Sequence, residues 1–345
     1  MTTCLITGGA GFFGKILKQR ALARGFQCVS VDLEADEDTH PRLISIQGDI
    51  RDSALMEKLF AEHRFETVYH CAAILAHTKV QRDYLWSCNV DGTRVIAGLA
   101  EKYQVRHAVF LSSNCLWAKN FGRPVRENDA PEPVEIYGRS KWEGEKIFQS
   151  YGNSFPTAII RCPTIMDEGR LGLLSILFEF IDEGRKLWLV GDGSNRYQFI
   201  YAQDLASACI MATEKKAEGV FNIGSDDVKS FRKVYQYVLD HVKTGARLAH
   251  LPKGPALWGM RLGHGLGLSP LGPYQYKMIA EDFLFDTSKI KDKLGWRPTL
   301  NNEEMLLKAY EYYRRNKRDI FSRKNVSAHR QAAKMGIIRL LKWAS

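Results

Sequence analysis

The sequence lacks any uninterrupted apolar run of about 18 residues, the length at which a segment becomes a candidate membrane-spanning helix. It also lacks a signal-peptide pattern, because Met1 leads directly into the apolar residues Cys4-Leu5-Ile6. We therefore expect a cytoplasmic protein. The seven cysteines are widely spaced, and no two of them stand at metal-ligand spacing. Reduced thiols and no metal site are expected.

Acidic residues are scarce at the C-terminal end, and this scarcity accounts for most of the net charge of +10. From Arg314 to Ser345 there are ten Lys or Arg and one acid, Asp319, so this segment carries +9. Taking these from the 49 basic and 39 acidic residues of the chain leaves 39 and 38, a body of +1. A nearly neutral body argues against nucleic-acid binding and leaves the basic tail a separate function or none.

Short β-branched runs alternate with helical patterns in the first half, which is typical of parallel βαβ units. Expected strands are Cys4–Thr7, Gln27–Val31, Leu43–Gln47, Thr67–His70, His107–Ser112 and Ala158–Arg161. Expected helices are Gly14–Arg24, Ser53–His63, Tyr84–Tyr103 and Tyr137–Tyr151. This pattern predicts an α/β fold with a doubly wound parallel sheet. Beyond Met166 the pattern loosens, and helical patterns return at Asp286–Leu294 and Glu303–Arg315, which indicates a smaller C-terminal lid over the carboxyl edge of the sheet.

A glycine-rich loop, Thr7-Gly8-Gly9-Ala10-Gly11-Phe12-Phe13-Gly14, follows the first expected strand and opens a helix. Such a loop lets the backbone approach a pyrophosphate, whose charge is met by N–H groups at the helix N-terminus. The second strand ends at Asp32, where an acid can accept hydrogen bonds from the adenosine ribose. Leu33 and Glu34 follow, without a cation for a 2′-phosphate, so NAD is favoured over NADP.

Three further motifs resemble the extended short-chain dehydrogenase/reductase family, also called the NAD-dependent epimerase/dehydratase family. They are Gly48-Asp49-Ile50-Arg51-Asp52, His70-Cys71-Ala72-Ala73 and Asn89-Val90-Asp91-Gly92-Thr93, and the resemblance covers roughly residues 3 to 310. It implies that Asp49 and Ile50 bracket the adenine, that Cys71, Ala72 and Ala73 line the pyrophosphate and ribose, and that Asn89 supports the neighbouring strand. Arg161-Cys162-Pro163-Thr164 matches the stretch behind the nicotinamide. The expected cofactor residues are Gly8, Gly11, Phe12, Phe13, Gly14, Asp32, Asp49, Ile50, Cys71, Ala72, Ala73, Asn89, Tyr137, Lys141, Cys162 and Pro163.

Tyr137-Gly138-Arg139-Ser140-Lys141 is a YxxxK motif that places Tyr137 and Lys141 one turn apart on one helix face. The lysine, together with a positive nicotinamide, favours the phenolate and lowers the tyrosine pKa. Ser113 ends the preceding strand, where the family keeps a Ser or Thr. The resemblance implies that Tyr137 takes the hydroxyl proton, Ser113 binds the reacting oxygen, and Lys141 tunes the tyrosine and holds the nicotinamide ribose.

These patterns divide the chain into three parts. Residues 1–165 are expected to form an NAD-binding Rossmann domain to which 196–213 returns, 166–315 mainly a substrate-binding lid, and 316–345 a basic, partly amphipathic tail. In the tail, Ala333, Ile337, Leu340 and Leu341 share a helical face. Such a helix can contact a membrane surface peripherally, pack on the body or a partner, or be frayed.

Substrate identity depends on positions where the sequence leaves the family's patterns. Asn114-Cys115 stands where sugar dehydratases carry an Asp-Glu pair, which argues against a dehydratase. Cys115 matches the catalytic cysteine of some GDP-sugar epimerases, but a pocket-lining thiol is the alternative. The candidate substrate residues are Asn114, Cys115, Thr164, Arg196, Tyr197 and Lys277. His77, Arg170 and His264 could reach a pocket, but lone residues of these types in loops are more often solvated or structural.

The favoured function is hydride transfer on a nucleotide sugar, as a 4-epimerase or 4-ketoreductase. A 3β-hydroxysteroid or other hydroxylipid dehydrogenase is the first alternative, because such relatives lack the diphosphate-binding arginines that are also uncertain here. A non-catalytic NAD(P)-binding sensor or scaffold is the second. The resemblance further implies a homodimer that pairs the helices at Tyr84–Tyr103 and Tyr137–Tyr151.

Overall fold

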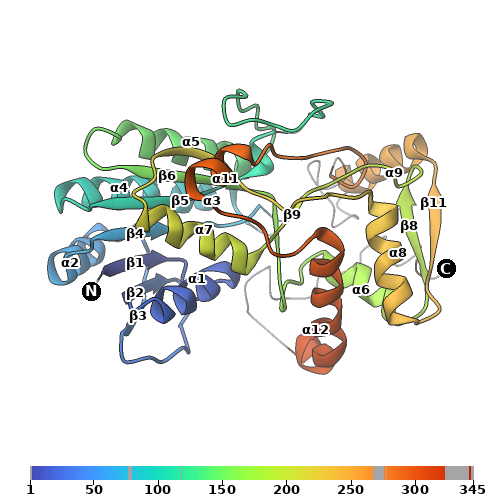
Figure 1. Cartoon of the computed structure of the whole chain (residues 1–345), viewed down its shortest axis with the longest axis horizontal. Helices are drawn as coiled ribbons and strands as arrows, with labels where there is room; N and C mark the ends of the chain where they lie inside the picture. Colours follow the sequence, from blue (N-terminus) through green and yellow to red (C-terminus); the bar gives the residue numbers. More distant parts are fainter. Residues whose placement is uncertain are drawn as a thin grey trace.

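A seven-stranded parallel sheet forms the centre of the molecule (Figure 1), in a computed structural model that describes residues 2–76, 80–117, 119–266, 276, 278–322 and 342. Its order is β10-β6-β5-β4-β1-β2-β3, so β1 lies between β2 and β4 at the switch point of the sheet. The expected α/β fold is confirmed, and each expected strand is found to within one residue at either end. The strands are β1 (Thr3–Thr7), β2 (Gln27–Asp32), β3 (Leu43–Gln47), β4 (Thr67–His70), β5 (His107–Ser113), β6 (Thr157–Cys162) and β10 (Gly219–Asn222).

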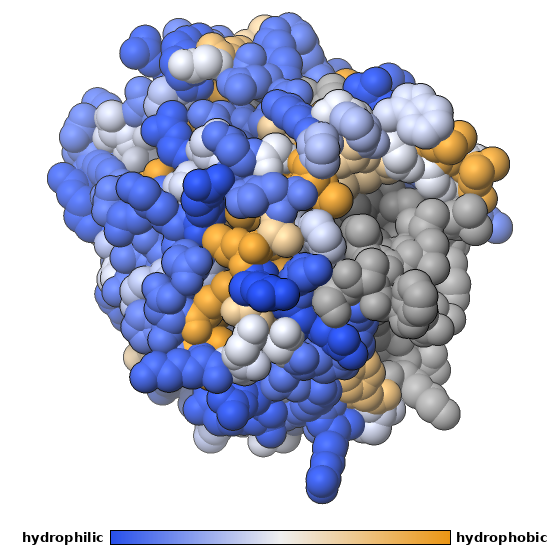
Figure 2. Space-filling model, turned by 90° about the vertical axis from the view of Figure 1, so that its right-hand side faces the viewer, coloured by the Kyte–Doolittle hydropathy of each residue, from blue (hydrophilic) through white to orange (hydrophobic). Residues whose placement is uncertain are grey.

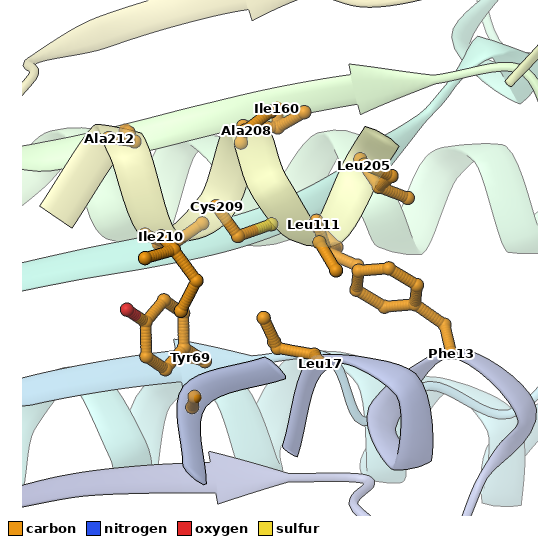
Figure 3. Packing of buried hydrophobic residues seen from close by; sticks show 14 of the residues in the cluster. Phe13, Leu17, Tyr69, Leu111, Ile160, Leu205, Ala208, Cys209, Ile210 and Ala212 are labelled. Carbon is orange, nitrogen blue, oxygen red and sulfur yellow. The ribbon is translucent and has the colours of Figure 1, made fainter. Parts of the chain in front are cut away.

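Helices cover both faces of this sheet. On one face lie α2 (Ser53–His63), α4 (Gly92–Lys102) and α5 (Ile136–Ser150), and on the other α1 (Phe12–Ala23), α7 (Ala202–Glu214) and α11 (Ser288–Leu294). In Figure 3, Leu205 and Cys209 of α7 face Phe13 and Leu17 of α1 above the sheet. The small buried side chains of α7, Ala208 and Ala212 among them, allow this close packing.

A second lobe lies beside the sheet (Figure 1). It contains α6 (Leu174–Asp182), α8 (Phe231–Val242), α9 (Lys253–Gly265) and α12 (Asn302–Ser322), the strand pair β8 (Lys186–Val190) and β11 (Arg247–Leu251), and the strand pair β7 (Thr164–Met166) and β9 (Phe199–Tyr201). Its own core includes Phe178, Tyr310 and Tyr313. None of the helices in the described ranges is both long enough and apolar enough to cross a membrane.

The chain passes between the lobe and the sheet several times. After β7 it returns to the sheet as α7, as β10 and as α11, which is more than the segment 196–213 expected from the sequence. Trp296, after α11, is fully buried and donates its indole N–H to the Asp204 carbonyl at 2.9 Å. At the start of α12, the Asn302 amide donates to the Tyr197 carbonyl at 2.7 Å. These contacts join the late part of the chain to both parts of the molecule.

A buried ion pair fixes α5 on the sheet. Arg161 of β6 donates from Nε to Glu145 Oε1 at 2.9 Å and from Nη2 to Oε2 at 2.6 Å, and both side chains are almost fully buried. Arg161 Nη1 also donates to the Glu127 carbonyl, and the guanidinium lies 5.0 Å from the Trp117 ring centroid. Glu145 stands one turn after Lys141 and two turns after Tyr137 on α5, so the pair sets the position of that helix face.

Replacing Arg161 alone should therefore be far more harmful than replacing both members of the pair. We expect Arg161→Met to lower the free energy of unfolding by about 3–5 kcal/mol, because it leaves Glu145 charged and buried without a partner. Arg161→Met combined with Glu145→Leu should recover most of that loss. Urea unfolding of the three proteins measures this. A double variant no more stable than Arg161→Met would show that the pair is not what holds α5.

Candidate active site

The glycine loop brings the backbone of β1 and α1 against the segment after β4. Gly8 has φ +74°, and a Cβ there would lie 2.8 Å from the Ala72 nitrogen. A Cβ on Gly14 would lie 1.9 Å from the Gly8 carbonyl oxygen. α1 begins at Phe12 after the extended residue Gly11, with no side chain capping it, and Phe12 and Phe13 are buried. This is the cradle that a pyrophosphate needs at a helix N-terminus.

Asp32, at the end of β2, is held beside this loop. Its carboxylate accepts hydrogen bonds from the backbone N–H groups of Ala10 and Glu34, each at 3.0 Å. The segment after β2 folds back onto α1, where the fully buried Lys18 binds Asp36 and Asp38, the latter at 2.9 Å. Lys15 also pairs with Asp38, at 2.8 Å, so these two acids are neutralised by lysines of α1 and Asp32 is the carboxylate that remains for a ribose.

Asp49 and Ile50 follow β3, at the same edge of the sheet. Arg51 binds the Asp49 carboxylate through Nε at 3.0 Å, and this contact lowers the pKa of Asp49. Ile50 packs against Gly92, where an added Cβ would lie 2.6 Å from Ile50 Cδ1. Gly92 thus lets α4 approach the segment expected to bracket the adenine.

A chain of buried hydrogen bonds runs through His70 at the end of β4. The Thr93 hydroxyl donates to the Asn89 carbonyl at 2.7 Å, so it accepts from His70 Nε2–H at 2.9 Å. His70 Nδ1 is then the acceptor and receives the Thr7 hydroxyl proton at 2.7 Å, while Thr7 Oγ1 accepts from the Ala72 N–H at 3.3 Å. Burial lowers the pKa of His70 to about 3, which keeps the ring neutral and this order of donors fixed.

Asn89 continues the network towards the catalytic helix. The sequence predicts one helix over Tyr84–Tyr103, but the structure has α3 (Arg82–Trp86), a π-helical turn (Ser87–Asp91) and then α4. Asn89, in this turn, accepts from the Ile74 N–H at 2.7 Å and donates to the Ile74 carbonyl and to Ser140 Oγ, both at 3.0 Å. The segment Cys71–Ile74 and α5 are therefore tied to one side chain.

Tyr137 lies in the first turn of α5, close to the end of β5. Gly138 permits this approach, because a Cβ there would lie 2.2 Å from the Cys115 carbonyl oxygen. Ser113 lies near enough to Tyr137 to lower the pKa of its phenol, and Ser113 Oγ accepts from the Cys115 N–H at 3.1 Å. Lys141 is buried one turn later, with Nζ 4.3 Å from the Phe110 ring centroid. The structure thus brings Ser113, Tyr137 and Lys141 together at the edge where the glycine loop ends.

Burial dominates the proton affinities of these groups. It raises the pKa of Tyr137, as do Cys115 and Cys162, while Arg170 and the Ser113 hydrogen bond act against it. It lowers the pKa of Lys141 to about 8, an effect that Cys162, Cys71 and Glu145 partly oppose. The lowered tyrosine pKa expected from the sequence is therefore not found in the chain alone, and forming the phenolate requires positive charge in addition to Lys141.

Three of the candidate substrate residues meet at one hydroxyl. Asn114, in the short 3-10 helix Asn114–Leu116, donates from Nδ2 to the Tyr197 hydroxyl at 2.5 Å, and Thr164 Oγ1 donates to it at 3.5 Å. Tyr197 belongs to the second lobe and is almost fully buried, with its ring stacked on Phe231. The hydroxyl therefore marks where the second lobe contacts the end of β5.

The other candidates lie in different surroundings. Arg196 is exposed, and its guanidinium pairs with Asp282 at 3.4 Å, away from the Tyr197 hydroxyl cluster. Cys115 acts on the pKa of Tyr137, which places its thiol near the tyrosine hydroxyl. Cys162 donates to the Ser112 carbonyl at 3.2 Å and leads into the buried Pro163. Lys277 and His77 lie outside the described residues, and His264 is on α9.

Arg170, which the sequence places among residues more often solvated or structural, lies near the candidate catalytic tyrosine. It lies between β7 and α6, and its charge acts on the pKa of Tyr137. The pKa of Arg170 in turn responds to Tyr137, Tyr197 and Cys162. Glu145 and His70 were also missed as organising groups. Arg170 follows Gly169 in a loop, where residues have no helical or strand periodicity. The sequence therefore could not predict which way the Arg170 side chain points.

Comparison with known proteins agrees with this arrangement. The family model described as NAD dependent epimerase/dehydratase family matches residues 4–224. An uncharacterized protein of Sinorhizobium fredii, y4nG, is 33% identical over 99% of this chain and 86% of its own length. A putative UDP-glucose 4-epimerase of Methanocaldococcus jannaschii is 25% identical over 91% of this chain and 99% of its own.

The fold also resembles solved structures. The crystal structure of UDP-glucose 4-epimerase from Thermotoga maritima with UDP-glucose superposes with a TM-score of 0.74 at 23% identity, covering 92% of this chain and 100% of that one.

Proposed function

Since the chain belongs to the NAD-dependent epimerase/dehydratase family and is similar to proteins named as UDP-glucose 4-epimerases, we propose that it transfers a hydride on a nucleotide sugar, as a 4-epimerase or 4-ketoreductase. The observation that carries the proposal is the cluster of Ser113, Tyr137 and Lys141 beside the glycine loop. A non-catalytic sensor or scaffold would have no use for this buried set, because burying Lys141 disfavours its charged form.

The residues fit an NAD cofactor. Gly8 and Gly14 leave a cradle that a Cβ would fill, and the Asp32 carboxylate beside it would repel a 2′-phosphate. When bound there, NAD⁺ supplies a hydride acceptor. Tyr137 then takes the proton of the substrate hydroxyl, Ser113 holds the reacting oxygen, and Lys141 keeps positive charge beside the tyrosine. For an epimerase the hydride would return to the opposite face of the carbon while Tyr137 returns the proton to its oxygen. For a ketoreductase NADH would supply the hydride, and Tyr137 would give its proton to the carbonyl oxygen.

The preference for NAD⁺ over NADP⁺ can be tested at Asp32. Asp32→Ala removes an acceptor for the ribose hydroxyls, so we expect NAD⁺ binding to weaken by about tenfold or more, and NADP⁺ binding to change less. Glu37→Ala, at an exposed position of the same segment, removes the same charge and serves as the control. Fluorescence titration with both cofactors measures this. Equal losses for NAD⁺ and NADP⁺ would remove the basis for the preference.

The role of Tyr137 can be tested by removing only its hydroxyl. Tyr137→Phe should bind NAD⁺ almost as the natural chain does, but lose hydride transfer by about a hundredfold or more, because the proton acceptor is gone. Tyr151→Phe, just past the other end of α5, is the matched control. NAD⁺ reduction and sugar epimerisation are followed with UDP-sugars and with 3β-hydroxysteroids, which represent the alternative substrate class. A Phe variant that keeps a tenth of the rate would mean that another base acts.

We also propose peripheral contact with an anionic membrane surface, through α9 and the basic tail. α9 exposes Trp258, Leu262 and, just past its end, Leu266, with 68%, 49% and 63% of their surfaces accessible. Figure 2 views this end of the molecule and shows hydrophobic groups at a largely hydrophilic surface. Residues 253–280 contain three Lys or Arg and no acid, and apolar residues beside basic ones are typical of interfacial helices. In the tail, Lys342 pairs with Glu183 of the segment after α6 at 2.7 Å, so this cation is engaged by the body.

Sedimentation with anionic vesicles tests this contact. The full chain should pellet at low salt, and replacing Trp258, Leu262 and Leu266 with Ser should leave it in the supernatant, because each removes apolar area from the interface. A chain ending at Ser322 separates the contribution of the tail from that of α9. If the full chain stays in the supernatant, the membrane proposal is wrong.

We also propose that two copies of the protein form a homodimer by pairing the helices at Tyr84–Tyr103 and Tyr137–Tyr151. α4 and α5 contact one another along the same face of the sheet, which is the arrangement such a pairing needs. A monomeric mass at micromolar concentration would refute it.

A further inference from the structure

Arg170 is a half-buried charge without a counter-charge among the described residues. Its Nε atom is buried and has no hydrogen-bond partner, and within the described ranges no carboxylate forms an ion pair with its guanidinium. Arg161, the comparable buried arginine of the molecule, is satisfied by Glu145 and by the Glu127 carbonyl. A guanidinium with a buried, unpaired N–H is costly, so a ligand is the natural source of its partner.

The loop that carries Arg170 directs its own acids elsewhere. Asp167 and Glu168 approach Lys308 of α12 at 3.9 and 3.7 Å, and Glu168 also binds Arg315 at 3.0 Å. Burial lowers the pKa of Arg170 to about 10, which leaves it charged at neutral pH. The loop therefore holds a cation on one side and neutralises its acids on the other.

The surroundings of Arg170 are those of the reacting group. Its charge acts on Tyr137 and Tyr197, and its Cζ lies 5.9 Å from the Phe12 ring centroid, at the start of α1. Asn114 and Thr164 bind the hydroxyl of the same Tyr197. Of these six side chains, Arg170 is the only cation.

We propose that Arg170 binds an anionic group carried by the substrate next to the carbon that reacts, and that this group is a carboxylate. The inference rests on the proposed function and narrows it to acidic sugars. A guanidinium offers two parallel N–H donors to a carboxylate, and a sugar acid carries its carboxylate on the atom adjoining C4, within reach of Tyr137. The same anion chemistry could come from the diphosphate of the nucleotide sugar or from the pyrophosphate of NAD, which the experiment separates.

The test compares UDP-glucuronate with UDP-glucose, which differ only in that carboxylate, on the NAD⁺-loaded chain. Arg170→Met should weaken UDP-glucuronate binding by about a hundredfold while UDP-glucose and NAD⁺ binding change less than threefold, and Arg170→Lys should restore part of the loss. Arg106→Met, at the amino end of β5 and paired with Glu66, is the control arginine.

Other outcomes would overturn the proposal. Equal losses for the two UDP-sugars would assign Arg170 to the sugar diphosphate, and loss of NAD⁺ binding would assign it to the cofactor. If the natural chain binds neither UDP-sugar, the proposed function fails, and the anion site is then read from thermal unfolding with D-glucuronate and D-glucose. A higher midpoint with D-glucuronate in the natural chain but not in Arg170→Met supports the site. If D-glucuronate raises the unfolding midpoint of neither the natural chain nor Arg170→Met, the proposal is overturned.

Discussion

The hydrogen bonds through His70 fix the positions on which the rest of the site depends. Thr7, His70, Thr93 and Asn89 are buried. Each ring nitrogen of His70 has one role, and each threonine hydroxyl donates one hydrogen bond and accepts another. A protonated imidazole would place two donors against two threonine oxygens and break this order. These hydrogen bonds link the end of β1, the end of β4 and the π-helical turn, and so they align the glycine loop with α5.

Buried charge is handled differently in the sheet and at its edge. Lys18 and Arg161 have carboxylate partners inside the protein, and these pairs hold the segment after β2 and the helix α5 in place. Lys141 and Arg170 have none at ion-pair distance in the described part of the chain. Lys141 lies one turn after Tyr137 on α5, and the charge of Arg170 acts on the Tyr137 phenol. Structural cations are thus neutralised within the fold, whereas those near the reacting position remain available to ligands.

Local sequence signals sufficed for six of the seven strands of the central sheet and for the two motifs of the candidate site. The glycine loop is defined by the spacing of its glycines, and the pair Tyr137 and Lys141 by a separation of one helix turn. Both motifs could therefore be predicted from the sequence. The π-helical turn at Ser87–Asp91 was not, because its residues continue the helical pattern on either side. β10 is only four residues long, and Glu145, His70 and Arg170 gain their roles from partners far away in the chain. The predicted roles of the site residues, and the division into domains, remain predictions.

The burial of Trp296 has a consequence for synthesis of the protein. The face of the sheet under α1 and α7 includes Ile290, Leu294 and Trp296 in its core, and the outer strand β10 begins only at Gly219. A chain emerging from the ribosome has therefore made the whole cofactor-binding half long before it can close that face. Contacts over such sequence separations form slowly. The apolar surface of the nascent half stays exposed to solvent during this interval.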